Sequence, residues 1–451
     1  MNQARLQALV RWVGVVGLGL AAGCGADREA VTSPSFAKGG GAGPSVAATD
    51  PSYGYEGEVA KQVTITGSGF STGAAAGWER NGAPDPKIQV LSTQFVSSTK
   101  LVASITIAPG AAIDLYDVAV TNPDRKKGIG YKLFEVTQAI AIQGTVLARE
   151  ANELGQIVGE SNGGAFFWSA ATGLESLAAS GTGMDLSDDG LTVAGSLGTS
   201  DPATKVAVVW TRSGGSWTQT QLPRDPATSR SNPFGMASDP VTGAPVAIAG
   251  VDIYVTKRTV QRQPRLWLPV GGGWQRIVLP NPSVPQNDIL AMDVSTGLVV
   301  VGNAGQRAAA WEPNGTGGWT PLVVGPPASD IRAINRAGTL AVGRNSQIAS
   351  YWTRAAGVWA GPFTLPGACT NAYDVDDLGR IAMSGCPSGI PSKPNAAIIS
   401  PPYGAGNILV LGGFGDLTTG PTLSGMSNLG TWIVGSSTIK NVATGAYWRA
   451  F

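Results

Sequence analysis

From residue 138 onward, apolar and polar positions follow one pattern that recurs seven times. Each copy has an alternating strand, a turn that begins with Asp, Asn or Ser and ends with Gly, and a second short apolar strand that ends in Gly; residues 374–385 are a clear example. A type I turn selects these residues, because the first side chain accepts a local backbone hydrogen bond and the last position often has positive φ. We therefore expect each copy to begin with an antiparallel hairpin. Two copies depart from the pattern: the turn at 238–243 is two residues longer, and the turn at 295–297 is one residue shorter.

A third strand follows in each copy, and in most copies it ends in tryptophan. These tryptophans are Trp168, Trp210, Trp267, Trp311, Trp352 and Trp448. Four copies add a second tryptophan and a fourth strand. Units of four strands with a period of about 46 residues are typical of β-propeller blades, so we predict a seven-bladed propeller over residues 138–451. Tryptophans at fixed blade positions are expected to pack between blades, which leaves Trp78 and Trp432 as the more exposed aromatic residues.

The strand count also predicts how the ring closes. The seventh copy ends at Phe451, just after its third strand, while residues 138–142 form an apolar strand that precedes the first hairpin and has no partner there. We expect this N-terminal strand to serve as the outer strand of the last blade, because pairing the two hides an exposed sheet edge.

Residues 51–137 show a different pattern of short alternating runs separated by Gly, Pro and Asn. The runs are 62–66, 88–91, 101–107, 115–121 and 131–136. Five short strands in fewer than 90 residues favour an antiparallel β-sandwich. Residues 63–70 (Val-Thr-Ile-Thr-Gly-Ser-Gly-Phe), residues 116–123 (Tyr-Asp-Val-Ala-Val-Thr-Asn-Pro) and Phe134 resemble the IPT/TIG immunoglobulin-like family. The resemblance implies a spacer or adhesive module without catalytic residues of its own. The whole chain is thus expected to be all-β, with an immunoglobulin-like sandwich followed by the propeller.

The propeller units have a resemblance of their own. Residues 152–159 (Asn-Glu-Leu-Gly-Gln-Ile-Val-Gly), followed by residues 165–168 (Ala-Phe-Phe-Trp), are similar to the HAF repeat of secreted bacterial proteins. The resemblance implies an extracellular repeat protein and assigns no activity.

The N-terminal segment indicates export. Residues 1–23 contain Arg5 and Arg11 followed by an apolar run that is too short to span a bilayer comfortably, which is typical of a cleaved signal peptide. The run Leu-Ala-Ala-Gly-Cys at 20–24 resembles a bacterial lipobox, which implies that Cys24 is lipidated and anchors the chain to a bacterial membrane, at the outer membrane or cell surface. The alternative is an ordinary secretory signal with an incidental cysteine. Residues 24–50 are rich in Gly, Ala and Ser and are expected to form a flexible tether.

Charge and composition exclude several kinds of site. The formal charge is +1, and the two arginines of the signal segment account for more than this excess, so the exported chain has no basic surface that would indicate nucleic-acid binding. The chain contains no histidine. This excludes Ser-His-Asp and Cys-His catalytic sites and histidine-ligated metal sites.

Cys369 and Cys386 are the two cysteines outside the lipobox. Cys369 lies seven residues before the first residue of the turn 376–379, and Cys386 lies seven residues after the last. If that turn sets the register of the hairpin, the two thiols face each other across it. In an oxidising compartment we expect a disulfide that contributes about 3 kcal/mol on the chain-entropy model, whereas a bulge would break this register.

Acidic residues recur two positions before the turns. They are Glu150, Asp185, Asp293 and Asp374, while the other three copies have Met236, Ala333 and Gly425. If these hairpins are the innermost strands, the four carboxylates lie at one height around the propeller axis and form a ring near one mouth of the channel. Such a ring could bind a cation such as calcium or the hydroxyls of a sugar. The alternative is that they are solvated strand ends. We expect no cofactor and no other metal site.

Two functions remain open at this point. The first is a non-catalytic, membrane-anchored surface or periplasmic protein whose propeller binds a glycan, a cell-wall component or a protein. The second is a glycosidase or lyase that uses carboxylates at the channel mouth, since pairs of Asp or Glu can perform such chemistry without histidine. Propellers host both classes, and no catalytic motif is present in the sequence.

Overall fold

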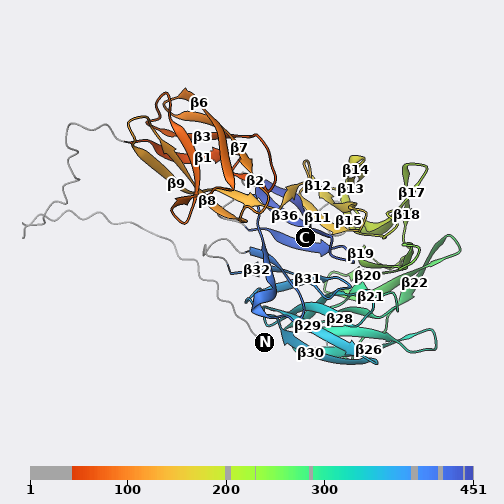
Figure 1. Cartoon of the computed structure of the whole chain (residues 1–451). Coiled ribbons are helices and arrows are strands. Elements are labelled where there is room, and N and C mark those ends of the chain that lie inside the picture. Colours follow the sequence, from red (N-terminus) through yellow and green to blue (C-terminus); the bar gives the residue numbers. More distant parts are fainter. Residues whose placement is uncertain are drawn as a thin grey trace, which may run out of the picture. The chain divides into compact units, whose positions relative to one another are not determined.

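The computed structural model describes residues 43–198, 205–228, 230–283, 288–387, 395–414, 420–439 and 442–449 (Figure 1). In this part of the chain the regular structure is β-strand, apart from one 3₁₀ turn, η2 (Ala405–Asn407). None of its helical segments has the length and apolarity that crossing a bilayer requires. The predicted signal peptide, Cys24 and the first part of the predicted tether lie outside the described residues.

Two sheets form the N-terminal sandwich. One sheet has the order β1-β3-β7-β6 and contains β1 (Ser45–Asp50), β3 (Lys61–Ser68), β6 (Ile88–Ser97) and β7 (Lys100–Ile107). The other has the order β2-β9-β8-β4-β5 and contains β2 (Tyr53–Tyr55), β4 (Ala75–Arg80), β5 (Ala83–Pro84), β8 (Asp114–Thr121) and β9 (Lys127–Thr137). Alternate residues of both sheets, among them Val63, Ile65, Tyr116 and Phe134, are buried in one hydrophobic core.

The first strand of this sandwich corrects the predicted tether. Residues 45–50 (Ser-Val-Ala-Ala-Thr-Asp) are mostly small and lack the alternation of a buried strand, but they pair antiparallel with β3 from Ser45↔Ser68 to Asp50↔Thr64. Main-chain pairing holds this edge strand in place, and most of its side chains are exposed. The prediction that the tether extends to residue 50 was therefore wrong for its last six residues.

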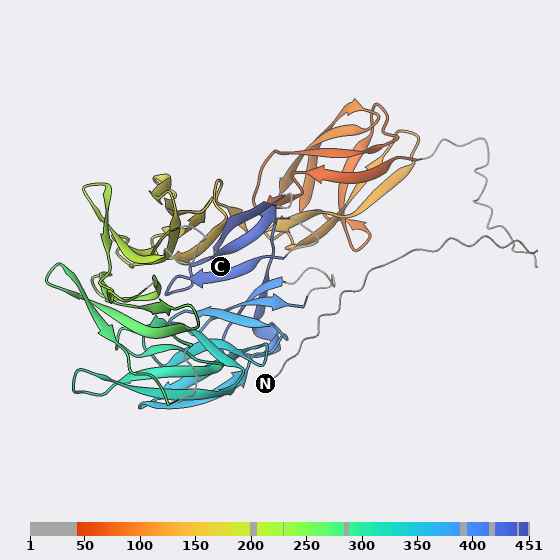
Figure 2. The same ribbon diagram turned by 180° about the vertical axis from the view of Figure 1, so that it is seen from behind.

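The described residues between 140 and 449 form seven four-stranded antiparallel sheets, as expected for seven blades (Figure 2). Blade 1 consists of β11 (Leu147–Ala151), β12 (Ile157–Ser161), β13 (Gly164–Ser169) and β14 (Gly173–Ala178). Blade 2 consists of β15 (Gly181–Leu186), β16 (Thr192–Leu197), β17 (Val206–Ser213) and β18 (Ser216–Gln221). Blade 3 consists of β19 (Arg230–Ser238), β20 (Pro245–Val255), β21 (Val260–Val270) and β22 (Gly273–Val278). Blades 4 and 5 are β23 (Ile289–Val294), β24 (Val300–Ala304), β25 (Arg307–Pro313) and β26 (Trp319–Pro327); and β27 (Ser329–Ile334), β28 (Leu340–Asn345), β29 (Ile348–Ala355) and β30 (Val358–Thr364). Blades 6 and 7 are β31 (Asn371–Val375), β32 (Ile381–Cys386), β33 (Asn395–Ile399) and β34 (Ile408–Leu411); and β35 (Thr422–Met426), β36 (Trp432–Ile439), β37 (Val442–Arg449) and β10 (Ile140–Ala141).

The ring closes as the strand count predicts. The first strands of successive blades pack against one another, and β35 of blade 7 packs against β11 of blade 1. The short strand β10 pairs antiparallel with β37, through Ile140↔Tyr447 and Ala141↔Ala446, and so supplies the outer strand of the last blade. The predicted fold class is confirmed.

The turns between the first two strands of each blade have the expected chemistry. Their first residue is buried and caps the turn; for example, Asn335 Oδ1 accepts hydrogen bonds from the N–H groups of Thr339 and Leu340. The fourth residue has positive φ, as at Gly338 (69°). Blade 4 differs from the prediction, because there the positive φ (62°) falls on Leu298. Its turn therefore has four residues, with a non-glycine residue in the strained position, and only the longer turn of blade 3, which has its positive φ at Gly243 (74°), departs from this length.

The repeated tryptophans join neighbouring blades. The indole N–H groups of Trp267, Trp311 and Trp448 donate to the backbone carbonyls of Pro223, Pro280 and Gly412, which follow the outer strands of the preceding blades. These rings are fully buried. The same role explains why the position repeats.

The prediction that Trp78 and Trp432 are exposed was wrong. Trp78 is 1% exposed and packs edge-on against Phe134 in the sandwich core. Trp432 is 9% exposed, lies beside Tyr447, and has the guanidinium of Arg449 over its ring. A tryptophan outside the repeating position can still be needed where two elements meet.

The predicted disulfide between Cys369 and Cys386 is present, with an S–S distance of 1.99 Å. Its register results from two deviations that cancel. The turn pairs Val375 with Ile381, one residue away from the register assumed from the sequence, and a bulge between Ala372 and Asp374 shifts the pairing back by one. The cysteines therefore meet because the bulge is present, whereas the sequence suggested that a bulge would separate them.

Candidate functional site

A β-bulge interrupts the innermost strand of every blade at the same height. In blade 4, for example, Ala291 pairs with Gly302 and Asp293 pairs with Val301, so Met292 has no partner in the ladder. The seven unpaired residues are Arg149, Met184, Phe234, Met292, Arg332, Tyr373 and Ser424. A bulge re-aims side chains and increases local twist. Here the seven unpaired residues form one layer of the channel lining, and the residues that directly follow them form a second layer.

The four predicted acids occupy the position just after the bulge. Glu150, Asp185, Asp293 and Asp374 line one small cavity of about 70 Å³, so the structure brings all four together around the axis. One assignment in the ring needs correction. The bulge between Pro233 and Gly235 makes Gly235, and not Met236, the blade 3 equivalent of these acids.

Three of the acids hold neighbouring blades together. Asp293 Oδ1 accepts the N–H of Val294 in its own strand (2.8 Å), and its Oδ2 accepts the N–H of Ile334 in blade 5 (2.9 Å). Asp185 makes the same two bonds, to Leu186 and to Met236 of blade 3, and Asp374 makes them to Val375 and to Met426 of blade 7. These carboxylates are neither solvated strand ends nor a ring of free ligands, because both oxygens of each Asp accept backbone N–H groups.

The acids alternate with small residues for a steric reason. A Cβ on Gly235 would lie 2.2 Å from Asp293 Oδ1, and a Cβ on Gly425 would lie 2.3 Å from Glu150 Oε2. Asp293 and Glu150 therefore each need a glycine in the preceding blade. Blades 2, 4 and 6 have Asp, and blades 3, 5 and 7 have Gly or Ala. Because seven is odd, the alternation must fail once, and it fails at blade 1, where Glu150 stands next to Asp185 of blade 2.

Burial raises the pKa of all four carboxyl groups. For Asp293 it raises the pKa to about 7, against the hydrogen bonds from Ile334 and Val294, which lower it. Burial also raises the pKa of Asp185 and of Asp374 well above the usual value, and the charge of Asp293 adds to the effect in both. For Glu150 burial is again the largest cause, followed by the charges of Asp374 and Asp185. The four residues are half-buried, and their side chains line the channel.

Calcium coordination gains no support from this geometry. Among the described residues there is no group of three or more Asp, Glu or Cys side chains arranged to hold a metal ion. The Asp oxygens already accept N–H groups, whereas calcium requires six to eight oxygen ligands. A calcium site at the ring remains a prediction from the sequence, which a calorimetric titration tests.

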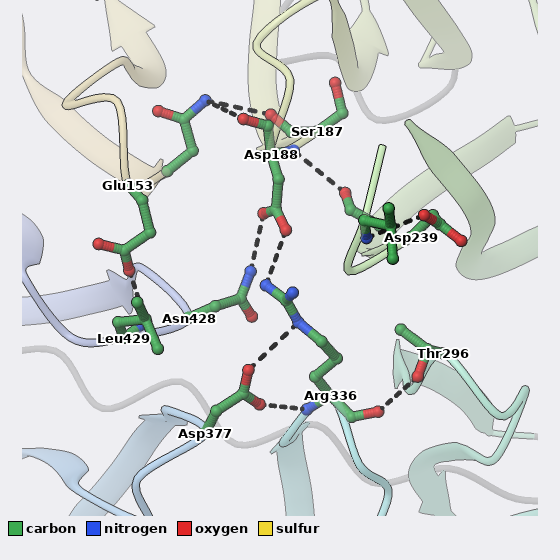
Figure 3. A network of polar contacts seen from close by, with 12 residues as sticks. Glu153, Ser187, Asp188, Asp239, Thr296, Arg336, Asp377, Asn428 and Leu429 are labelled. Carbon is green, nitrogen blue, oxygen red and sulfur yellow. Dashed lines mark hydrogen bonds and ion pairs between the residues drawn. The ribbon is translucent and has the colours of Figure 1, made fainter. Parts of the chain in front are cut away.

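One end of the channel is occupied by a polar network of residues at the second position of the turns (Figure 3). Arg336 of blade 5 reaches across the axis, and its guanidinium donates to Asp188 Oδ2 in blade 2 (2.7 Å). The same guanidinium pairs with Asp377 of blade 6 through Nε (3.2 Å). Asn428 of blade 7 donates to the other oxygen of Asp188 (2.8 Å). We call this network the Arg336 latch.

The Arg336 latch is held from both sides. The backbone N–H of Arg336 donates to Asp377 Oδ1, and its carbonyl accepts the hydroxyl of Thr296 from blade 4. Burial raises the pKa of Asp188 and of Asp377, and the charge of Arg336 opposes that shift in both. One arginine therefore joins four blades over the end of the channel.

The other end of the channel opens into a larger cavity. All seven bulge residues and the four acids line it, and its volume is about 450 Å³. We call it the channel cavity. Its walls combine apolar and aromatic side chains (Met184, Met292, Phe234, Tyr373) with three arginines (Arg149, Arg332, Arg344), and the guanidinium of Arg332 lies 4.6 Å from the ring centre of Tyr373. This volume lies within the range of small-molecule sites, which measure about 300–1,000 Å³.

The sequence indicates the four acids, but neither the latch residues nor the bulge residues were predicted from it. The latch residues share the second turn position in each repeat, and their polarity at one fixed position was the available signal. The bulge residues had a weaker signal: Arg149, Met184 and Tyr373 share little except their distance from the turn, and Phe234 lies one residue farther from its own turn. No residue type marks the bulges, since the unpaired residues are Arg, Met, Phe, Tyr and Ser.

Comparison with known proteins identifies no family. A scan against family models and a search of curated proteins gave no match. Among solved structures, the chain is similar to a virginiamycin B lyase from Staphylococcus aureus, with 10% sequence identity and a TM-score of 0.43 over 69% of this chain and 99% of that chain. A structure of a prolyl endopeptidase gives the same identity, TM-score and coverage of this chain, which spans about half (51%) of the endopeptidase chain. Neither similarity carries an activity, and the seven-bladed architecture rests on the strand pairing described above.

Proposed function

We propose that the protein is a non-catalytic, membrane-anchored surface or periplasmic lipoprotein whose propeller binds a glycan, a cell-wall component or a protein in the channel cavity. The resemblances to the IPT/TIG and HAF families support an exported binding protein in which the sandwich acts as a spacer. The observation that carries the proposal is the channel cavity itself, about 450 Å³ and lined by one bulge residue from each of the seven blades. Because the Arg336 latch occupies the opposite end, a ligand would approach from the side of the bulges.

Blocking the channel cavity tests this function. Ser424 is a small bulge residue of blade 7 that lines the cavity, so Ser424→Trp would fill space that a ligand needs. We expect binding to arrays of oligosaccharides and peptides and to insoluble cell-wall polysaccharide, and at least a tenfold loss of affinity in the variant. Thr218→Trp, which places the same side chain at an exposed position of outer strand β18, is the matched control. Equal binding by the two variants would exclude the cavity as the site.

The membrane anchor rests on the lipobox resemblance at Cys24. Cells given a radioactive fatty acid are expected to label the wild-type protein, and a Cys24→Ser chain should remain unlabelled and appear in the soluble fraction. Labelling of the Cys24→Ser chain would contradict the assignment.

A carboxylate-based glycosidase or lyase is the second candidate. The observation that favours it is Asp293, whose pKa of about 7 suits a general acid at neutral pH and which lies on the floor of the cavity. Its two oxygens, however, already accept N–H groups from two blades. Release of reducing ends from the polysaccharide panel, abolished by Asp293→Asn, would favour the enzyme; binding without release favours the binding protein.

A further inference from the structure

A second cavity of about 430 Å³ lies between blades 4 and 5. It is built where β24 and β28 end, at their turns into β25 and β29 and just before β27. Its lining consists of Asp288, Leu290, Asn303, Gly305, Gln306, Ala328, Ser329, Asp330, Arg344, Ser346 and Gln347. We call it the blade 4–5 groove. Three of these residues, Ala328, Ser346 and Gln347, have positive φ (64°, 49° and 71°). For Ser346 and Gln347 this conformation belongs to the two-residue hairpin turn between β28 and β29.

The groove continues the channel cavity. Four residues line both spaces: Leu290, Asn303, Asp330 and Arg344. The two together extend from the propeller axis to the rim between two blades. A single small ring would fill only part of this space, so its shape fits an elongated ligand.

The hydrogen-bonding groups of the groove are mainly side chains. Several backbone N–H groups there already have partners: Gly305 donates to the carbonyl of Asp288, Ser329 to that of Gln306, and Ser346 to that of Ala328. A peptide that binds by strand addition requires unpaired backbone groups along an edge. The groove instead presents amides and hydroxyls from Gln306, Ser346 and Gln347, whose side chains are exposed.

An ion-pair cluster stands where the two cavities join. Asp330 accepts hydrogen bonds from Arg332 Nε through Oδ1 (3.2 Å) and from Arg344 Nε through Oδ2 (2.5 Å). Both bonds use only Nε, and each guanidinium has four further N–H donors. Two arginines share one carboxylate, and their planar guanidinium groups can donate the remaining N–H groups to oxygen atoms of a ligand.

We propose that the ligand is an oligosaccharide that lies along the blade 4–5 groove with one end in the channel cavity. Sugars present many hydroxyls that donate and accept, which amides, hydroxyls and guanidinium groups can bind, and they present C–H faces that pack on aromatic rings. Phe234 and Tyr373 supply such rings at the axial end. This inference rests on the proposed binding function and names the class of ligand and the residues that select it.

Titration with defined hexasaccharides tests the inference. The probes are hexamers of the cello-, xylo- and chito- series and a hexamer of galacturonic acid. We expect at least one to bind the wild-type protein. Gln306→Ala and Arg344→Lys should each weaken that binding about tenfold, the first by loss of an amide and the second by loss of the fork while the charge is kept. Thr320→Ala, at an exposed position of β26 in blade 4, should leave affinity unchanged. Each variant is used only if it keeps the wild-type thermal transition.

The outcomes separate this inference from the function on which it rests. Binding of a hexasaccharide that is weakened by both groove variants and by Ser424→Trp supports it. If Gln306→Ala and Arg344→Lys leave sugar binding unchanged, the oligosaccharide does not bind in the blade 4–5 groove. Binding of array peptides without any sugar, still blocked by Ser424→Trp, would overturn the ligand class but leave the binding function. If neither sugars nor peptides bind the wild-type protein, both the oligosaccharide inference and the proposed binding function are wrong.

Discussion

Deletion of the last 15 residues, 437–451, is expected to abolish cooperative unfolding of the propeller. The deletion removes the last three residues of β36 and all of β37, the partner of β10, and leaves one edge of the remaining part of β36 unpaired. It also removes Trp448, which is fully buried and bonds to the carbonyl of Gly412 in blade 6. Calorimetry should show the transition of the sandwich and lose that of the propeller.

A peptide of residues 437–451 provides the control for this deletion. If the strand acts by closing the ring, the peptide added to the truncated chain should restore the propeller transition, because β37 pairs on both sides through its backbone. A truncated chain that keeps a cooperative propeller transition without the peptide would show that closure is not needed.

The sequence predicts the architecture well because the architecture depends on repetition and on strand edges. Seven copies of one hairpin cannot each bury both faces, so they must stack, and counting strands shows which edges remain open. The role of β10 follows from this count alone. Trp267 and Trp311 were predictable as packing residues for the same reason, since a tryptophan position that recurs in six of the seven blades serves the contact between blades.

The pairing register of the individual strands was not predicted correctly from the sequence. Bulges change which residue pairs with which, and no single residue type marks them in this sequence. For this reason Met236 was placed in the ring where Gly235 stands, although Gly235 has the steric property that the ring requires. The disulfide shows the same limit, because its cysteines pair only after the bulge compensates for the turn.

The role of the acids could not be predicted from their positions. The sequence places Glu150, Asp185, Asp293 and Asp374 at one height, and the structure confirms that they meet. Carboxylates at one height can bind a ligand or accept hydrogen bonds from the protein's own backbone. Which of the two occurs depends on nearby backbone N–H groups, such as those of Val294 and Ile334, which donate to Asp293. Ala333 and Gly425 were visible in the sequence, but the alternation is complete only when the bulge puts Gly235 in place of Met236, beside Asp293.

Asp293→Ala is expected to lower the free energy of unfolding of the propeller by about 2–5 kcal/mol at pH 5. The variant leaves the N–H groups of Val294 and Ile334 without their acceptor, and each buried donor that loses its partner costs about 1–3 kcal/mol. Urea denaturation of the two proteins measures the difference. Asp124→Ala, which removes an exposed acid of the sandwich, is the matched control and should change stability little.

The difference between wild type and Asp293→Ala should shrink as the pH rises from 5 to 8. Burial raises the folded-state pKa of Asp293 to about 7, above its usual value, so the folded protein binds this proton more tightly than the unfolded chain does. The stability that this proton supplies is complete below the unfolded pKa of about 4 and is lost as the pH rises through about 7. Between pH 5 and 8 the wild type should lose up to about 2–3 kcal/mol that the alanine variant does not lose. A constant difference across this range would mean that the Asp293 carboxylate is already ionised at pH 5, and that its two hydrogen bonds outweigh the cost of burial.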